Sequence, residues 1–261
     1  MNTESIIIGL FCRVDDRYRD FPKDPAVLLH PSEIVTLGLL FALKGKGNRP
    51  FYRWLSRNYR YLFPKLPERT WLFRLFNAYR HLTDRLLAGT SILGVVDSFG
   101  IELIHPFREH RSNGQIGRKG LSNHRWIVGA KLCVVLNHLG LPVSWECGGA
   151  NLPDQAFHEM IADFDGEMII YADSGFHAAD GDPDNLVICQ RGERNFRMVV
   201  ETFFSLLQGV LAGKRLAHRS WDALAAHIGF ALAVMTILVQ WDGLIADEYG
   251  FVRLSIADFS L

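Results

Sequence analysis

The chain has 261 residues, enough for one large domain or for a core domain with a smaller appendage. Its hydrophobic fraction of 49% and charged fraction of 21% are ordinary for a globular protein, and its four cysteines form no C-x-x-C pair, so extensive disorder and structural zinc are not expected. The formal net charge of zero argues by itself against a DNA-binding protein, but the distribution of charge matters more than the sum.

Basic and acidic residues are concentrated in different parts of the chain. Between Lys44 and Arg85 there are eleven Lys and Arg residues against two acids. Between Gly149 and Gln190 there are nine acids and no Lys or Arg. A basic segment that holds phosphates and an acidic segment that binds cations suit a protein that binds and cuts nucleic acid.

The first ninety residues have a helical pattern. The spacing predicts a helix that opens at Pro31, with Ser32 as its N-cap, and runs through Leu43, followed by helices over 51–63 and 67–87. Three short helices with basic outward faces suit a helix-turn-helix DNA-binding unit, but a helical bundle with a solvated charged surface fits the pattern equally well. Residues 1–89 are predicted as one helical region.

From Ser91 onward short buried strands alternate with helices. Such interleaving predicts an α/β layer architecture for residues 90–261, with loops over 113–120 and 180–183. The predicted strands cover 92–96, 100–104, 126–136, 141–147, 168–172 and 186–190, and the predicted helices cover 154–164 and 194–208.

The segment 223–241 is nearly all apolar and long enough to cross a membrane. It contains His227, Thr236 and Gln240, and no second candidate span accompanies it. We therefore favour a helix buried against the sheet over a transmembrane helix.

Three acidic residues occur in contexts that predict a metal site. Asp97 follows the apolar run SILGVV, Asp173 follows EMIIYA, and Glu201 lies in the helical stretch NFRMVVETFFSLLQ. Carboxylate oxygens suit Mg²⁺ or Mn²⁺, and functional groups gather at the carboxyl ends of strands in open α/β sheets. The alternatives are that each Asp caps a turn and that Arg197 and Glu201 form a surface pair.

Basic residues near these acids, and on the amino-terminal helices, are candidates for contacts to DNA phosphates. Trp126 and Trp145 could stack on an extruded base, although core packing is about three times better supported. The basic candidates are Arg118, Lys119, Arg125, Lys131, Arg194 and Arg197 near the acids and Arg53, Arg57 and Arg60 on the helices.

Five blocks of sequence together resemble the bacterial insertion-sequence transposases of the DDE type, from about Ser91 to Trp241. They are VVDSF, GRKGLSNHRWIVGAKLCVV, GGANLPD, IIYADSGF and RMVVETFFSLLQ. The segment SEIVTLGLL, with FYRWL and YLFPKLP after it, is similar to the helical amino-terminal region of one subfamily. The resemblance implies a ribonuclease-H-like catalytic core preceded by a helical DNA-binding region.

The resemblance also implies particular roles. Asp97, Asp173 and Glu201 correspond to the metal-binding acids, with two Mg²⁺ or Mn²⁺ ions per active site, and Arg197 and Lys131 to basic residues of the family's motifs. Arg194 and Gln208 depart from the family, which often has a tyrosine and a basic residue there. The implied partners are double-stranded DNA (transposon ends and target) and further copies of the chain, in a dimer or larger oligomer, in the bacterial cytoplasm and without a membrane.

The implied activity is binding of terminal inverted repeats, hydrolysis of the phosphodiester at each end and joining of the 3′-hydroxyl to target DNA. Two alternatives stay open at this point. One is a nuclease on the same core that cuts and never joins, and the other is a domesticated, non-catalytic DNA-binding derivative.

Overall fold

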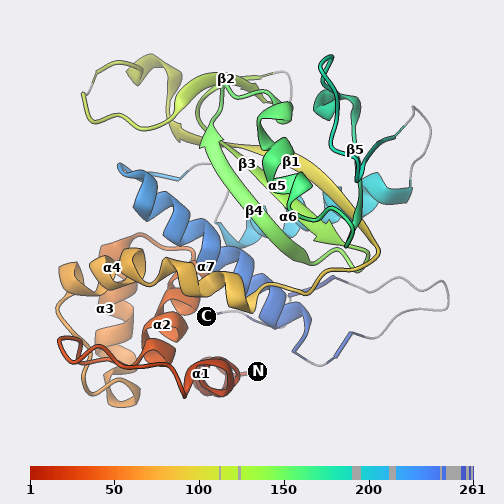
Figure 1. Cartoon of the computed structure of the whole chain (residues 1–261). Helices are drawn as coiled ribbons and strands as arrows, with labels where there is room; N and C mark the ends of the chain where they lie inside the picture. The colour runs from red at the N-terminus through yellow and green to blue at the C-terminus, as the bar shows by residue number, and fades with distance from the viewer. Residues whose placement is uncertain are drawn as a thin grey trace.

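The computed structural model describes residues 1–111, 113–122, 125–189, 195–211, 216–241, 243–244 and 254–256, with Phe259 and Leu261; of residues 195–197 it describes the backbone alone. Within these residues the chain is an α/β structure in which helices flank a mixed sheet (Figure 1).

The sheet is built around two long antiparallel strands, β1 (Leu93–Ile104) and β3 (Arg125–Asn137). β2 (Arg118–Ser122) and β4 (Pro142–Gly149) both pair with β3. β5 (Ile169–Ala172) and β6 (Leu186–Ile188) extend the other edge in parallel, giving the order β2-β3-β1-β5-β6 with β4 beside β3. β1 is therefore the strand at which the pairing changes: it is antiparallel to β3 on one side and parallel to β5 on the other.

The two faces of the sheet are covered differently because side chains alternate along each strand. Val95, Phe99 and Ile101 of β1 belong to the larger hydrophobic core, which α6 (Asn195–Val210) and α7 (Trp221–Val239) share. Val96 belongs to a smaller core on the other face, beneath η4 (Asp154–Phe157) and α5 (His158–Ala162). Odd-numbered residues of β1 therefore face α6, and even-numbered residues face α5.

The first part of the chain forms helices that pack on α7 (Figure 1). α2 contacts α7 along much of its length, and Gly38 allows the ring of Phe230 to approach closely: a β-carbon there would lie 2.4 Å from the ring. The helices of this region are α1 (Thr3–Tyr18), α2 (Pro31–Lys44), α3 (Asn48–Asn58), η1 (Arg60–Leu62), α4 (Arg69–Ala78) and η2 (Arg80–Leu86).

α7 is the apolar segment that sequence analysis singled out. By length and composition it could cross a membrane. However, 78% of the residues in its most apolar stretch are buried inside the protein. It lies between the amino-terminal helices and the sheet (Figure 1). The expectation of a buried helix agrees with this placement.

Several predicted boundaries were wrong. The two strands predicted at 92–96 and 100–104 are one strand, β1, because β3 pairs with it from Gly94 to Ile104 and overrides the break suggested by Ser-Phe-Gly. The predicted loop 113–120 overlaps β2, which forms a hairpin with β3. His30, rather than Ser32, caps α2. The helix predicted over 67–87 is divided into α4 and η2, and that over 154–164 into η4 and α5.

One further helix also differs from its predicted bounds. The helix predicted over 51–63 begins earlier, at Asn48, and is followed by a short 3₁₀ helix, η1. Other elements, such as β3 and α6, agree with their predicted bounds to within two residues.

Short 3₁₀ turns shape the ends of two strands. η3 (Pro106–Arg108) follows β1, and η5 (Ser174–Phe176) follows β5. Asp173 is the N-cap residue of η5, and its backbone is still extended, with φ −79° and ψ 174°. This acid therefore lies at the point where β5 ends and the 3₁₀ turn begins.

Candidate active site

Asp97 and Asp173 occupy matching positions on neighbouring strands. β1 and β5 run parallel with Leu93, Gly94 and Val95 opposite Ile169, Ile170 and Tyr171. Two residues beyond the last pair, the same register brings Asp97 level with Asp173. Adjacent strands are ~4.8 Å apart, so the two backbones are close at this point. The structure corrects one detail: Asp97 lies within β1, not at its end, and only Asp173 follows the last residue of its strand.

A third carboxylate, that of Asp154, joins this region from the start of η4. Its Oδ1 accepts hydrogen bonds from Ser98 Oγ at 2.6 Å and from Lys131 Nζ at 3.0 Å. Ser98 is the neighbour of Asp97, whose Oδ1 accepts from the Ser98 backbone N–H at 2.7 Å. Asp154 thus connects β1 and β3 to the segment that precedes α5.

Asp154 also lies beside Asp173. A β-carbon built on Gly175 would be 2.9 Å from Asp154 Oδ2 and 3.0 Å from Asp173 Oδ1. The Gly175 backbone N–H donates to Asp173 Oδ1 at 2.9 Å, which turns this carboxylate toward its own loop. Glycine at position 175 therefore leaves room for two carboxylates to approach each other.

The negative charge of this region affects the thiol beneath it. Burial raises the pKa of Cys133 well above its ordinary value, and the charges of Asp154 and Asp97 raise it further. Cys133 is opposite Ser98 in the β1–β3 ladder. Its thiol is thus a buried, protonated neighbour of the acids and is unsuited to be a metal ligand or a nucleophile.

Glu201 approaches from α6 on the same side of the sheet as Asp97. The rings of Phe99 and Phe204 stack with centroids 5.2 Å apart, which fixes α6 against β1. Asp97 precedes Phe99 by two residues on the same face of β1, and Glu201 precedes Phe204 by three residues, or about one helical turn. Glu201 is exposed, whereas Val200, Phe203 and Leu207 are buried, as the helical pattern predicted.

The donors suit a hard divalent cation, because the candidate ligands are all carboxylates and Asp97 and Asp173 are both accessible to solvent. Within the described parts of the chain, no group of three or more His, Cys, Asp or Glu side chains is already arranged to hold a metal ion. The structure therefore brings Asp97, Asp154 and Asp173 to one region and places Glu201 on the helix beside it, without a preassembled three-ligand set.

The basic candidates have different surroundings. Lys131 is bonded to Asp154, and Arg125 Nη2 donates to Glu102 Oε2 at 3.0 Å. Arg118 and Lys119 are exposed on β2, and the ammonium of Lys119 is 5.5 Å from the ring centroid of the exposed Trp126. Core packing was therefore the wrong expectation for Trp126, whereas Trp145 packs against the core. Arg194 and the side chain of Arg197 lie outside the described residues.

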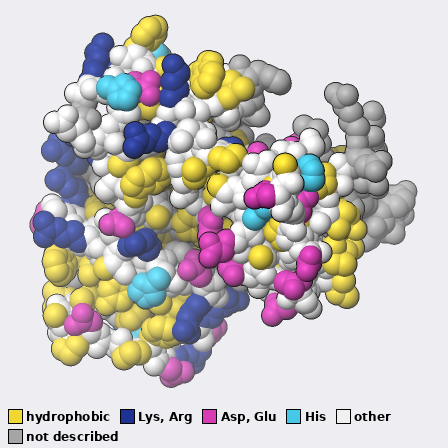
Figure 2. All heavy atoms as spheres, turned by 45° about the horizontal axis from the view of Figure 1, so that its top comes forward, with side chains coloured by type: hydrophobic (Ala, Val, Ile, Leu, Met, Phe, Trp, Pro, Cys, Tyr) yellow, Lys and Arg dark blue, Asp and Glu magenta, His cyan; other side chains and the backbone are white. Residues whose placement is uncertain are grey.

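The helical candidates Arg53, Arg57 and Arg60 are all exposed. Figure 2 shows Lys and Arg side chains mostly on the left of this face and Asp and Glu around its centre and right, so cationic and anionic side chains are largely separated on this face. Arg53 and Arg57 line an open hollow of about 400 Å³ together with Arg49 and Trp54.

Sequence analysis missed Asp154. The motif GGANLPD was noticed as a block, but its terminal acid was not assigned a role, because an Asp that begins a helical turn after proline is usually an ordinary cap. Comparison with protein-family models, with curated proteins and with solved structures finds no match to this chain.

Proposed function

We propose that this protein is a DDE-type DNA transposase of an insertion sequence, with a ribonuclease-H-like catalytic core and a helical DNA-binding region. In this proposal it binds the terminal inverted repeats, hydrolyses a phosphodiester at each end and joins the 3′-hydroxyl ends to target DNA. The observation that carries the proposal is the register of β1 and β5, which brings Asp97 level with Asp173. The five sequence blocks and the position of Glu201 on α6 support it.

In the proposed mechanism Asp97, Asp173 and Glu201 hold the metal. The chemistry that two bound Mg²⁺ or Mn²⁺ ions supply is activation of the attacking hydroxyl and charge stabilisation at the leaving oxygen. Lys131 holds Asp154 at 3.0 Å and so limits the negative charge next to the metal-binding acids. Both side chains of this ion pair are largely buried, at 15% and 23% exposure, which makes their interaction stronger than that of a surface pair.

The basic residues outside the acidic region would hold the DNA backbone on either side of the scissile phosphate. Arg118 and Lys119 on β2 are near the sheet, and Arg53, Arg57 and Arg60 are on the helical region. Two DNA ends have to be processed together, so the working form is proposed to be a dimer or a larger oligomer. The proposed location is the bacterial cytoplasm, in association with the nucleoid.

The test is metal-dependent cleavage of a labelled duplex that carries the inverted repeats flanking the gene. Asp97→Asn removes one negative charge and one ligand, and we expect it to abolish Mg²⁺-dependent cleavage while DNA binding is retained. Asp165→Asn makes the same chemical change at an exposed acid in the turn before β5 and should cleave normally. Normal cleavage by the Asp97→Asn protein would refute the proposal.

A strand-transfer assay with pre-cut ends separates the proposed transposase from a nuclease. Joining of the 3′-hydroxyl to a target plasmid is expected of the wild-type protein. Cleavage without joining would assign the protein to the nucleases. DNA binding with neither reaction, at any Mg²⁺ or Mn²⁺ concentration, would assign it to the non-catalytic derivatives.

A further inference from the structure

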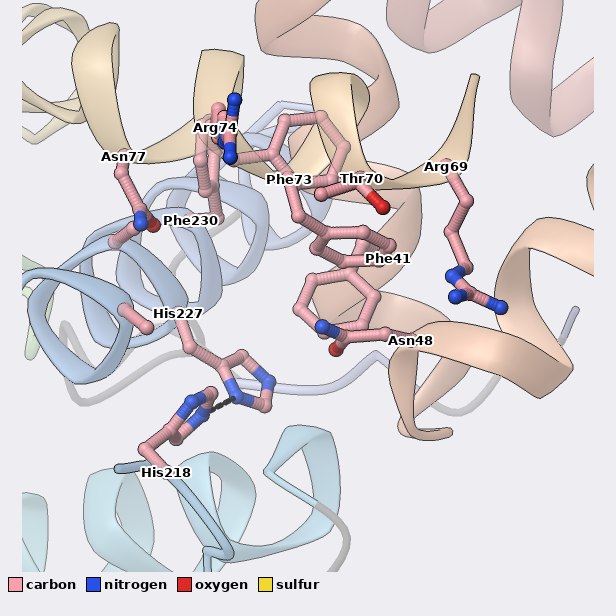
Figure 3. Close-up of a pocket in the computed structure, with 13 residues that line it drawn as sticks. Phe41, Asn48, Arg69, Thr70, Phe73, Arg74, Asn77, His218, His227 and Phe230 are labelled. Atoms are coloured by element: carbon pink, nitrogen blue, oxygen red, sulfur yellow. Dashed lines mark hydrogen bonds between the residues drawn. The ribbon is translucent and has the colours of Figure 1, made fainter. Parts of the chain in front are cut away.

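A cavity of about 360 Å³ opens among α2, α3, α4 and α7, away from the acidic region (Figure 3). Ligand pockets typically measure ~300–1,000 Å³, and a water molecule takes up only ~30 Å³. The cavity is therefore large enough for a small organic group and too large to be explained by one ordered water.

Aromatic side chains form much of its lining. Phe41 is at the centre of this group: its ring centroid is 5.0 Å from that of Phe73 in an edge-to-face arrangement and 5.0 Å from that of His227. Phe76 and Phe230 complete the aromatic side, with centroids 5.6 Å apart. A planar, π-rich ring is the kind of group that such a surface binds by stacking and edge contacts.

His227 supplies a polar atom that is directed into this space. The side chain is 7% exposed, and its Nδ1 shares a hydrogen bond of 2.8 Å with His218 Nε2. Its Nε2 is buried and has no hydrogen-bond partner among the residues that the structure describes. Figure 3 shows this nitrogen on the side of the ring away from His218, facing the space near Asn48 and Phe41. A buried polar nitrogen is stabilised by a ligand that completes its hydrogen bond.

Two of the polar residues that line the cavity are cations, beside the neutral side chains of Asn48, Thr70 and Asn77. Arg69 and Arg74, on successive turns of α4, both line it, and Arg74 is exposed to solvent. Guanidinium groups bind phosphate with paired hydrogen bonds. The cavity thus combines a surface for an aromatic ring, one buried hydrogen-bonding atom and a site for an anion.

We propose that this cavity binds an unpaired nucleotide, with the base against the Phe41 group, a ring edge hydrogen-bonded to His227 and the phosphates on either side of the nucleotide on Arg69 and Arg74, whose guanidinium groups lie on different sides of the cavity (Figure 3). The proposal rests on the proposed DNA-binding function. A nucleotide within a DNA strand fits better than a free nucleotide, because Asn48, which lines the cavity, begins α3, and Arg49, Arg53 and Arg57 of the same helix line a second, open hollow. A strand that leaves the cavity would continue over these cations.

The experiment compares two duplexes that differ only in one nucleotide, an unpaired 2-aminopurine in the first and the same base fully paired in the second. We expect the wild-type protein to bind the unpaired form about tenfold more tightly, as stacking of one base on aromatic side chains implies. We also expect the 2-aminopurine fluorescence to fall on binding, since its ring becomes stacked. Equal affinity for the two duplexes would overturn the proposal.

Variants test whether the cavity is the cause of the tighter binding to the unpaired form. Arg69→Gln combined with Arg74→Gln should remove the preference for the unpaired form, and so should His227→Phe, which keeps the ring and removes both nitrogens. Lys65→Gln is the matched control, because this exposed cation lines neither the cavity nor the hollow beside α3, and its loss should leave the preference for the unpaired form unchanged. If His227→Phe fails to fold, the arginine pair carries the test alone. A preference that persists in the arginine variant would refute the assignment.

Competition by free 2-aminopurine deoxyribonucleoside monophosphate tests whether the cavity binds a nucleotide within a DNA strand or a free nucleotide. Competition with the unpaired duplex at equal concentration would overturn the assignment to a DNA strand, whereas weak competition supports it. The Asp97→Asn protein keeps the preference if the cavity acts as proposed, even though it does not cleave. Loss of cleavage and loss of the preference therefore report on the proposed function and on the cavity separately.

Discussion

The buried pair His218 and His227 should make the protein acid-labile. Burial lowers the pKa of His227 to about 3, helped by the neighbouring imidazole, and burial lowers the pKa of His218 to about 4. In the unfolded chain both titrate near ~6.5. Because the folded-state values are depressed, the pair's contribution to stability is fully present above pH ~6.5 and is lost progressively as the pH falls toward the folded-state values.

The size of the effect can be worked out from linkage. One pH unit below the unfolded pKa costs about 1.4 kcal/mol for a group that stays neutral in the folded state. At pH 5.5 we therefore expect a loss of about 1.4 kcal/mol from His227 and somewhat less from the partly exposed His218. About 2 kcal/mol in total is a substantial part of the ~5–15 kcal/mol by which small proteins are stable.

Urea unfolding at pH 7.5 and 5.5 measures this loss. A variant with both His218→Gln and His227→Gln keeps side chains that hydrogen-bond but do not titrate, so its stability should change less with pH, by about 2 kcal/mol, than that of the wild-type protein. His110→Gln is the control, since its side chain is 81% exposed and its removal should leave the pH dependence unchanged. Equal pH dependence in the wild type and the double variant would show that the pair is already hydrated or charged in the folded protein.

Three further substitutions test other parts of the structure. Asn185→Leu should destabilise the protein by about 1–3 kcal/mol in urea unfolding, because the buried amide donates to the backbone carbonyls of Ile161 and Met168 and both hydrogen bonds would be lost. Gly120→Ala should lower the melting temperature or prevent folding, since the new β-carbon would lie 1.9 Å from the backbone oxygen of Ala150; an unchanged melting temperature would contradict this contact. Lys131→Met should lower the Mg²⁺ concentration that gives half-maximal cleavage, because it leaves the Asp154 carboxylate without its cation and so adds negative charge beside the proposed metal-binding acids; an unchanged or higher concentration in a Mg²⁺ titration of cleavage would contradict this.

Much of the sheet could be predicted because its strands have a clear local signal. β3 is buried on both of its faces and is rich in β-branched residues, so its predicted bounds were correct to within one residue at each end. α7 was found from its apolar run alone. The break within β1 was wrong because Ser-Phe-Gly resembles a turn locally, whereas the hydrogen bonds to β3, from distant residues, decide the conformation.

The candidate site was predicted only in part for a related reason. An acid after an apolar run is visible in the sequence, so Asp97, Asp173 and Glu201 were identified. The contacts of Asp154 with Ser98 and Lys131 join residues that are 56 and 23 positions apart, and no local pattern indicates them. The pairing of His218 with His227 depends equally on how the segment before α7 folds back on the helix.

The location of the candidate site results from the unequal lengths of two strands. β1 has twelve residues and β5 has four, and they pair only along Leu93–Val95. Beyond that pair β5 gives way to Asp173 and η5, while β1 continues through Asp97 and Ser98. Asp97 faces α6 and Ser98 faces the segment before α5, so this is where acids from both faces of the sheet can meet.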